Sequence, residues 1–117
     1  MNVQYFGCIS DILYREVEVP CAPEQAWEYV IDPSWLGDDG SLTAVPGGEG
    51  WIASGDDTRY LVVEEVDEAR RFAFRWASFG DEPSRVEIDL EPTAVGTRIA
   101  IRESPLESRD RMCLAAR

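Results

Sequence analysis

The sequence predicts a single α+β domain in which a curved antiparallel sheet of about six or seven strands follows a short helical segment. Three observations support this fold class. Residues 11–19 alternate like a strand and lead directly into a helix start at Pro23, a residue tolerated at the first helical position. Residues 41–102 consist of short alternating segments separated by turn residues. A chain of 117 residues is the size of one domain.

The N-terminal elements have clear apolar faces. The strand at residues 11–19 places Leu13, Arg15, Val17 and Val19 on one face. The helix at residues 23–32 carries an apolar stripe of Ala26, Trp27, Val30 and Ile31. Pro33 ends this helix, and residues 34–36 are expected to add one further turn, which makes a short helix pair. Residues 1–10 are a weakly patterned extension that either caps a core or adds an edge strand.

The remaining strands are expected at residues 41–45, 50–54, 59–66, 72–77, 85–91 and 97–102. In the last three of these strands one face is apolar: Phe72, Phe74, Trp76, Val86, Ile88, Leu90, Ile99 and Ile101. The opposite face is charged: Arg75, Arg85, Glu87, Asp89, Arg98 and Arg102. An antiparallel sheet with one solvated face has this pattern, and the charges are expected to pair across strands.

Composition excludes several functions. The net charge of −12 disfavours binding to nucleic acid and to anionic membranes. The chain has no His, and all 11 basic residues are Arg, so His-dependent nucleophiles, His metal sites and Lys Schiff bases are excluded. We expect neither a metal nor a cofactor. Cys8, Cys21 and Cys113 fit no disulfide or zinc pattern, which favours a reducing cytoplasm. Neither a signal peptide nor a membrane span is expected.

Five segments in order resemble a known superfamily. They are Val19-Pro-Cys-Ala-Pro-Glu-Gln-Ala-Trp27, Asp32-Pro33, Pro46-Gly47-Gly48 before Trp51, residues 66–72 leading into Phe74 and Trp76, and residues 86–98 with Glu91-Pro92 and Gly96-Thr97-Arg98. Together they resemble the START-like (Bet v-like, SRPBCC) helix-grip superfamily, in its AHSA-type branch related to the activator of the heat-shock protein 90 ATPase. The resemblance covers roughly residues 11 to 104.

The resemblance implies a curved sheet wrapped around a long C-terminal helix, with a cavity between them. Members bind lipids, sterols, polyketides or plant hormones, and some are polyketide cyclases, dehydratases or co-chaperones. Here residues 105–117 predict a shortened C-terminal helix. We therefore expect uncovered apolar sheet and a homodimer in which a second copy covers it; a truncated tail is the alternative.

The expected ligand cavity is lined by Trp27, Tyr60, Val62, Glu64, Phe72, Phe74, Trp76, Val86, Ile88, Ile99 and Ile101. Glu64 is a carboxylate inside this chamber if its strand face points inward; in the opposite register Leu61 and Val63 point inward and Glu64 meets water. Arg15 pairs with Glu64, anchors a ligand carboxylate, or extends to the rim. The aromatic residues either line the chamber or form an ordinary core.

These expectations favour a non-catalytic protein that binds a small apolar ligand between sheet and helix. One alternative is a protein-interaction module that resembles the chaperone activators. The other is an enzyme resembling polyketide cyclases or dehydratases, in which Glu64 or Tyr60 acts through water.

Overall fold

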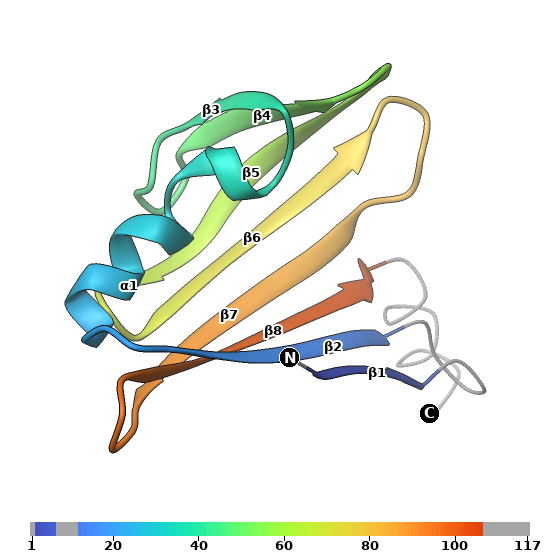
Figure 1. Cartoon of the computed structure of the whole chain (residues 1–117). Coiled ribbons are helices and arrows are strands. Elements are labelled where there is room, and N and C mark those ends of the chain that lie inside the picture. The colour runs from blue at the N-terminus through green and yellow to red at the C-terminus, as the bar shows by residue number, and fades with distance from the viewer. Residues whose placement is uncertain (1, 7–11, 107–117) are drawn as a thin grey trace, which may run out of the picture.

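The computed structural model describes residues 2–6 and 12–106, with side-chain environments for residues 12–106. Eight antiparallel strands form one sheet in the order β1-β2-β8-β7-β6-β5-β4-β3, and two short helical segments join β2 to β3 (Figure 1). The elements in chain order are β1 (Asn2–Phe6), β2 (Ile12–Val19), α1 (Pro23–Val30), the 3-10 helix η1 (Pro33–Trp35), β3 (Asp39–Leu42), β4 (Glu49–Ser54), β5 (Asp57–Asp67), β6 (Arg71–Ser78), β7 (Ser84–Pro92) and β8 (Thr97–Pro105).

This architecture confirms the predicted α+β helix-grip class. The sheet has eight strands because β1 pairs with β2 at the edge, which is one of the two roles expected for the N-terminal extension. Pro23 is the first residue of α1, as predicted, and Pro33 begins η1 after α1 ends. The Asp32 carboxylate accepts a hydrogen bond of 2.9 Å from the Ser34 amide and so caps that turn. The predicted C-terminal helix at residues 105–117 lies, apart from its first two residues, outside the described part of the chain.

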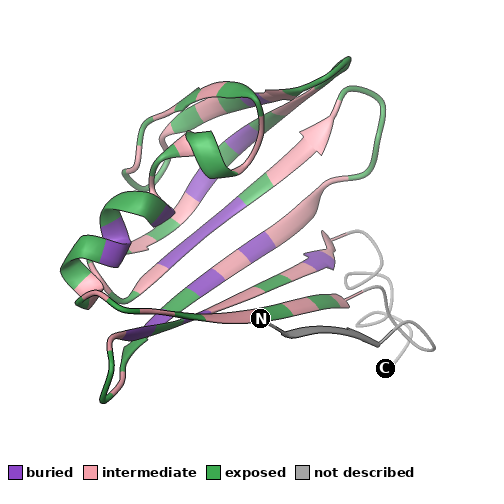
Figure 2. Ribbon diagram, viewed as in Figure 1, coloured by how far each residue is buried: buried purple, intermediate pink, exposed green. Residues whose placement is uncertain are grey.

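The sheet has an inner face toward α1 and an outer face away from it. Directly paired residues of antiparallel neighbours lie on the same face, so the register defines whole rows of side chains. One inner row runs through Leu13, Glu103, Val86, Phe74 and Val63 on five successive strands. Figure 2 shows the resulting alternation of buried and more exposed positions along β5 and β7.

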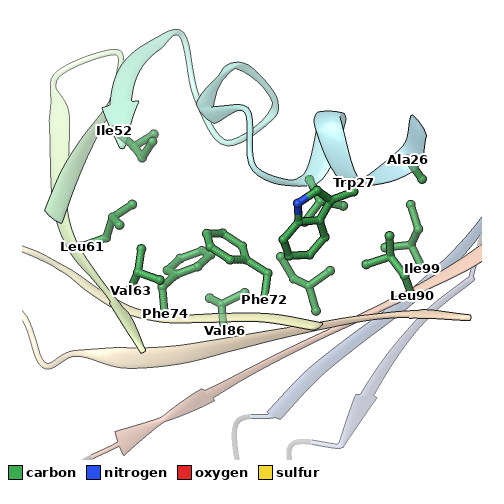
Figure 3. Packing of buried hydrophobic residues seen from close by; sticks show 12 residues of the cluster. Ala26, Trp27, Ile52, Leu61, Val63, Phe72, Phe74, Val86, Leu90 and Ile99 are labelled. Carbon is green, nitrogen blue, oxygen red and sulfur yellow. The ribbon is translucent and has the colours of Figure 1, made fainter. Parts of the chain in front are cut away.

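The core lies between α1 and the inner face. Trp27 points from α1 onto the sheet and meets Phe72 edge-on, with 6.0 Å between ring centroids (Figure 3). Phe72 contacts Phe74 at 5.6 Å, and Phe74 contacts Trp76 at 5.4 Å, so the aromatic rings form a continuous line along β6. Phe72 and Phe74 are fully buried. This packing joins the helix to the sheet, because aromatic side chains bury large apolar areas.

The turn before β8 holds the connection between β2 and α1 in place. Thr97 is fully buried, and its hydroxyl donates a 2.7 Å hydrogen bond to the carbonyl oxygen of Cys21. The preceding residue, Gly96, lies so close to β2 that a Cβ atom there would stand 2.0 Å from the Val19 carbonyl oxygen. A side chain at Gly96 would therefore displace backbone. Among the described residues, no helix is long and apolar enough to span a membrane.

Replacing Gly96 with Ala is expected to lower the free energy of unfolding by about 2 kcal/mol or more, because the added methyl group overpacks against backbone atoms that cannot move alone. Urea denaturation followed by circular dichroism measures the change. Val95 in the same turn is 69% exposed, so Val95→Ala serves as the control and should unfold near the wild-type midpoint. Equal midpoints for Gly96→Ala and wild type would contradict the close approach.

Candidate functional site: a hollow on the inner face of the sheet

The outer face carries charges that neutralise one another. Arg75 and Arg85 both bind the Glu64 carboxylate, each with an N–O distance of 2.7 Å. Arg85 also binds Glu87 at 2.9 Å, and Arg71 binds Glu65 at 2.9 Å. The pairing expected for this face is confirmed. The hydrogen bond from Arg71 is the main cause that lowers the pKa of the Glu65 carboxyl below its ordinary value. Because these charges are paired with each other, they leave little free charge to recognise a ligand.

A β-bulge determines which side of β5 faces outward. Val63 pairs with Phe74, but the next pair joins Glu65 to Ala73, so Glu64 is the extra residue. Leu61 and Val63 are buried on the inner face, whereas Tyr60 is 62% exposed. Beyond the bulge Val66 returns to the inner face opposite Phe72.

Tyr60, Val62 and Glu64 therefore lie on the outer face and cannot line a chamber between the sheet and α1. Their assignment to the cavity is wrong, and the alternative register holds. The pattern placed Tyr60, Val62 and Glu64 on one face with Val66 by assuming an uninterrupted period of two over residues 59–66. The extra residue breaks that period, so Val66 faces inward while the other three face outward. Glu64 is held by two arginines and is not a carboxylate in an apolar chamber.

The inner face is hollowed at the end of the sheet away from α1. The hollow has a volume of about 260 Å³. Its lining comes from β2, η1, β6, β7 and β8 and the residue after η1: Leu13, Tyr14, Arg15, Trp35, Leu36, Trp76, Val86, Ile101 and Glu103. Two smaller hollows of about 170 and 120 Å³ share lining residues with it, Leu36 and Trp76 on one side and Trp35 and Ile101 on the other. Together they form a furrow along the inner face, with mostly apolar walls in the largest and smallest hollows and with Ser54, Asp57 and Arg59 in the hollow of about 170 Å³.

Glu103 is the acidic group of the main hollow. Its Oε2 atom accepts a 3.0 Å hydrogen bond from Trp76 Nε1 and a 2.7 Å hydrogen bond from the Ser84 hydroxyl. Arg59 places Nη1 3.9 Å from the same oxygen, and its guanidinium carbon lies 4.4 Å from the centre of the Trp76 ring. The carboxylate is thus held in one orientation by three neighbours.

The remaining predicted cavity residues divide into two groups. Trp27, Phe72, Phe74, Ile88 and Ile99 are buried in the core, and of these only Ile88 and Ile99 reach the smallest hollow. Trp76, Val86 and Ile101 line the main hollow. Arg15 also borders it, from an exposed position on β2. These remaining residues therefore lie on the inner side of the sheet. Some of them form the packed core and others line the hollow. Their contact with a ligand remains a prediction.

Other parts of the described surface are less suited to a ligand. A wider depression of about 950 Å³ beside the start of α1 is lined by both acids and arginines, including Glu24, Arg70 and Arg98. Its lining mixes both signs of charge with apolar residues such as Leu90 and Pro92, so it presents no uniform surface to a ligand. Within residues 12–106, no group of three acidic, Cys or His side chains is placed to hold a metal ion.

Residues 20–113 match a protein family described as Activator of Hsp90 ATPase homolog 1-like protein. The chain belongs to this family. The match covers most of the sequence, including β4 to β8 and the helical segments, and therefore includes every element that builds the furrow except β2. A comparison with curated proteins gave no match.

Solved structures with the same fold include proteins of different size. DynU16, a protein of the dynemicin biosynthetic locus, is 27% identical with a TM-score of 0.71, and the match covers 81% of this chain and 37% of DynU16. CalU16 from Micromonospora echinospora is 16% identical with a TM-score of 0.67, over 82% of this chain and 61% of CalU16. This family member therefore spans less than two thirds of either protein.

A third structure adds information on assembly. The Aha1 dimer from Colwellia psychrerythraea is 14% identical with a TM-score of 0.69, over 80% of this chain and 75% of that one. Its sequence identity supports a shared fold alone. For this member of the Activator of Hsp90 ATPase homolog 1-like family, the function of the furrow must therefore be inferred from the residues that line it in this chain.

Sequence reasoning missed Glu103, the acidic group of the main hollow in this family member. The signal was present, because Thr97, Ile99 and Ile101 alternate and the next residue in that series is Glu103. The strand was expected to end at residue 102, but β8 extends to Pro105. Trp35 was also missed as a lining residue, since its placement depends on a hydrogen bond of 3.0 Å from its Nε1 to the Val30 carbonyl oxygen.

Proposed function

We propose that this protein binds a small, mostly apolar ligand in the inner-face furrow and does not itself catalyse a reaction. The main support is the hollow of about 260 Å³, which has mostly apolar and aromatic walls, one oriented carboxylate from Glu103 and Arg15 at its border. Binding sites for small molecules typically combine apolar walls with a few placed polar groups in this way.

The size of the furrow limits the ligand. The main hollow is just below the range of about 300–1,000 Å³ that is typical for drug-sized ligands. Its extensions of about 170 and 120 Å³ lie along the same face. A compact aromatic or alicyclic molecule fits this shape better than a long lipid. Trp35 and Trp76 offer ring surfaces on two sides of the hollow.

A substitution that fills the hollow should abolish binding. Leu13 lines the hollow at the start of β2 and is 43% exposed, so Leu13→Trp adds volume there with little strain. The matched control is Val62→Trp, because Val62 has a similar exposure of 37% on the outer face. A thermal-shift screen with aromatic alcohols, sterols and fatty acids identifies a probe, and saturation at about a hundred times Kd should stabilise the protein by about 2.7 kcal/mol.

With that probe, Leu13→Trp is expected to weaken binding by about tenfold or more, because the indole occupies volume that the ligand needs and a loss of about 1.4 kcal/mol of binding free energy is tenfold in Kd. Val62→Trp should bind like wild type. Equal weakening by both variants, or by neither, would argue against the inner-face furrow as the binding site. A screen in which no compound binds would count against the proposed function itself.

Two other functions have specific observations in their favour. The family description, and the similarity to the Colwellia Aha1 structure, favour a protein-interaction module related to chaperone activation. If no compound in the screen binds and the protein captures a chaperone, protein interaction would rank above ligand binding as the function. DynU16, at 27% identity, is a protein of a biosynthetic locus, and this supports the alternative of an enzyme resembling polyketide cyclases or dehydratases. Conversion of a bound ligand would rank that function above ligand binding alone.

We also propose that the protein forms a homodimer in which a second copy covers apolar sheet. The similar Colwellia protein is a dimer, and Leu13 near the sheet edge is 43% exposed. Sedimentation equilibrium at tens of micromolar is expected to give twice the mass of the chain. A single species with the mass of one chain at that concentration would contradict the dimer.

A further inference from the structure

We propose that Glu103 determines ligand specificity, so that the furrow selects molecules that donate a hydrogen bond, such as phenols and alcohols, over molecules that carry a carboxylate. This inference depends on the proposed function. Its basis is a charged side chain in an otherwise apolar row: Glu103 pairs with Leu13 on one side and with Val86 on the other.

The carboxylate has one occupied and one available oxygen. Oε2 receives the hydrogen bonds from Trp76 and Ser84 and is the atom nearest to Arg59. No hydrogen bond from residues 12–106 reaches Oε1, and 29% of the side chain is exposed. Since an ionised carboxylate accepts but cannot donate, a ligand group that meets Oε1 must be a donor.

The neighbours of Glu103 keep this acceptor in place. Trp76 is itself fixed by edge-on contact with Phe74 and by the Arg59 guanidinium over its ring. Ser84 faces Trp76 directly across the β6–β7 pairing. An acceptor oriented in advance loses little entropy when the ligand binds, and a hydrogen bond to a charged acceptor is stronger than a neutral one.

Arg15 would favour the opposite ligand chemistry, a molecule that carries a carboxylate. It borders the same hollow from an exposed position, and a guanidinium would attract a ligand carboxylate. The two polar groups therefore select opposite ligand chemistry. Glu103 is the better placed of the two, because its orientation is fixed by hydrogen bonds within the hollow.

The test compares three probes of nearly equal size: naphthol, methoxynaphthalene and naphthoate. Isothermal titration calorimetry measures each against the full-length wild type, Glu103→Gln and Arg15→Gln, and circular dichroism confirms that the variants fold. In wild type we expect naphthol to bind about tenfold more tightly than methoxynaphthalene, since a hydrogen bond to a charged group gains roughly that much. Naphthoate should bind most weakly.

Glu103→Gln should remove most of the preference for naphthol and improve naphthoate, while methoxynaphthalene stays nearly unchanged. A purely structural role for Glu103 would instead change all three affinities equally. Arg15→Gln should leave the naphthol preference intact. Tightest binding of naphthoate, lost in Arg15→Gln, would overturn the inference and assign specificity to Arg15. Equal binding of all three probes would overturn it but leave the proposed function standing, whereas no binding by any probe would overturn both.

Discussion

The pairing register of β2, β8, β7 and β6 decides which side chains share the inner face of the sheet. Directly paired residues share a face, so the same register that buries Phe72 and Phe74 against α1 also brings Glu103 into the inner face. A shift by one residue in β8 would turn Glu103 outward and place Arg102 among apolar side chains. That shift is strongly unfavourable, because it would move Ile99 and Ile101 from the inner face to the solvent-exposed outer face.

Core and furrow are parts of one inner wall. Near α1 the wall is closed by Trp27, and the aromatic side chains of β6 are fully buried there. Further along β6 no described helix covers the wall, and Trp76 borders open space. The line of rings from Trp27 to Trp76 connects the two regions, so the proposed ligand site is continuous with the aromatic packing of the core.

The hydrophobic periodicity of the sequence predicted most of this fold, because long strands with one solvent-exposed face alternate apolar and polar residues with a period of two. It identified the inner faces of β6 and β7 correctly and the charge pairing of the outer face. It failed at Glu64, because a bulge inserts one residue without an evident signal in the sequence. It also followed the last strand only to residue 102, one residue before Glu103, although β8 continues to Pro105.

The most direct test of this account is the environment of the Trp76 indole in solution. Nuclear Overhauser effects from the Trp76 Nε1 proton, measured on ¹⁵N-labelled protein, should reach side-chain protons of Ser84 and Glu103. That result would establish the inner-face register on which the furrow and its acceptor depend. Contacts from this proton to Tyr60 or Arg85, which lie on the outer face, would contradict it.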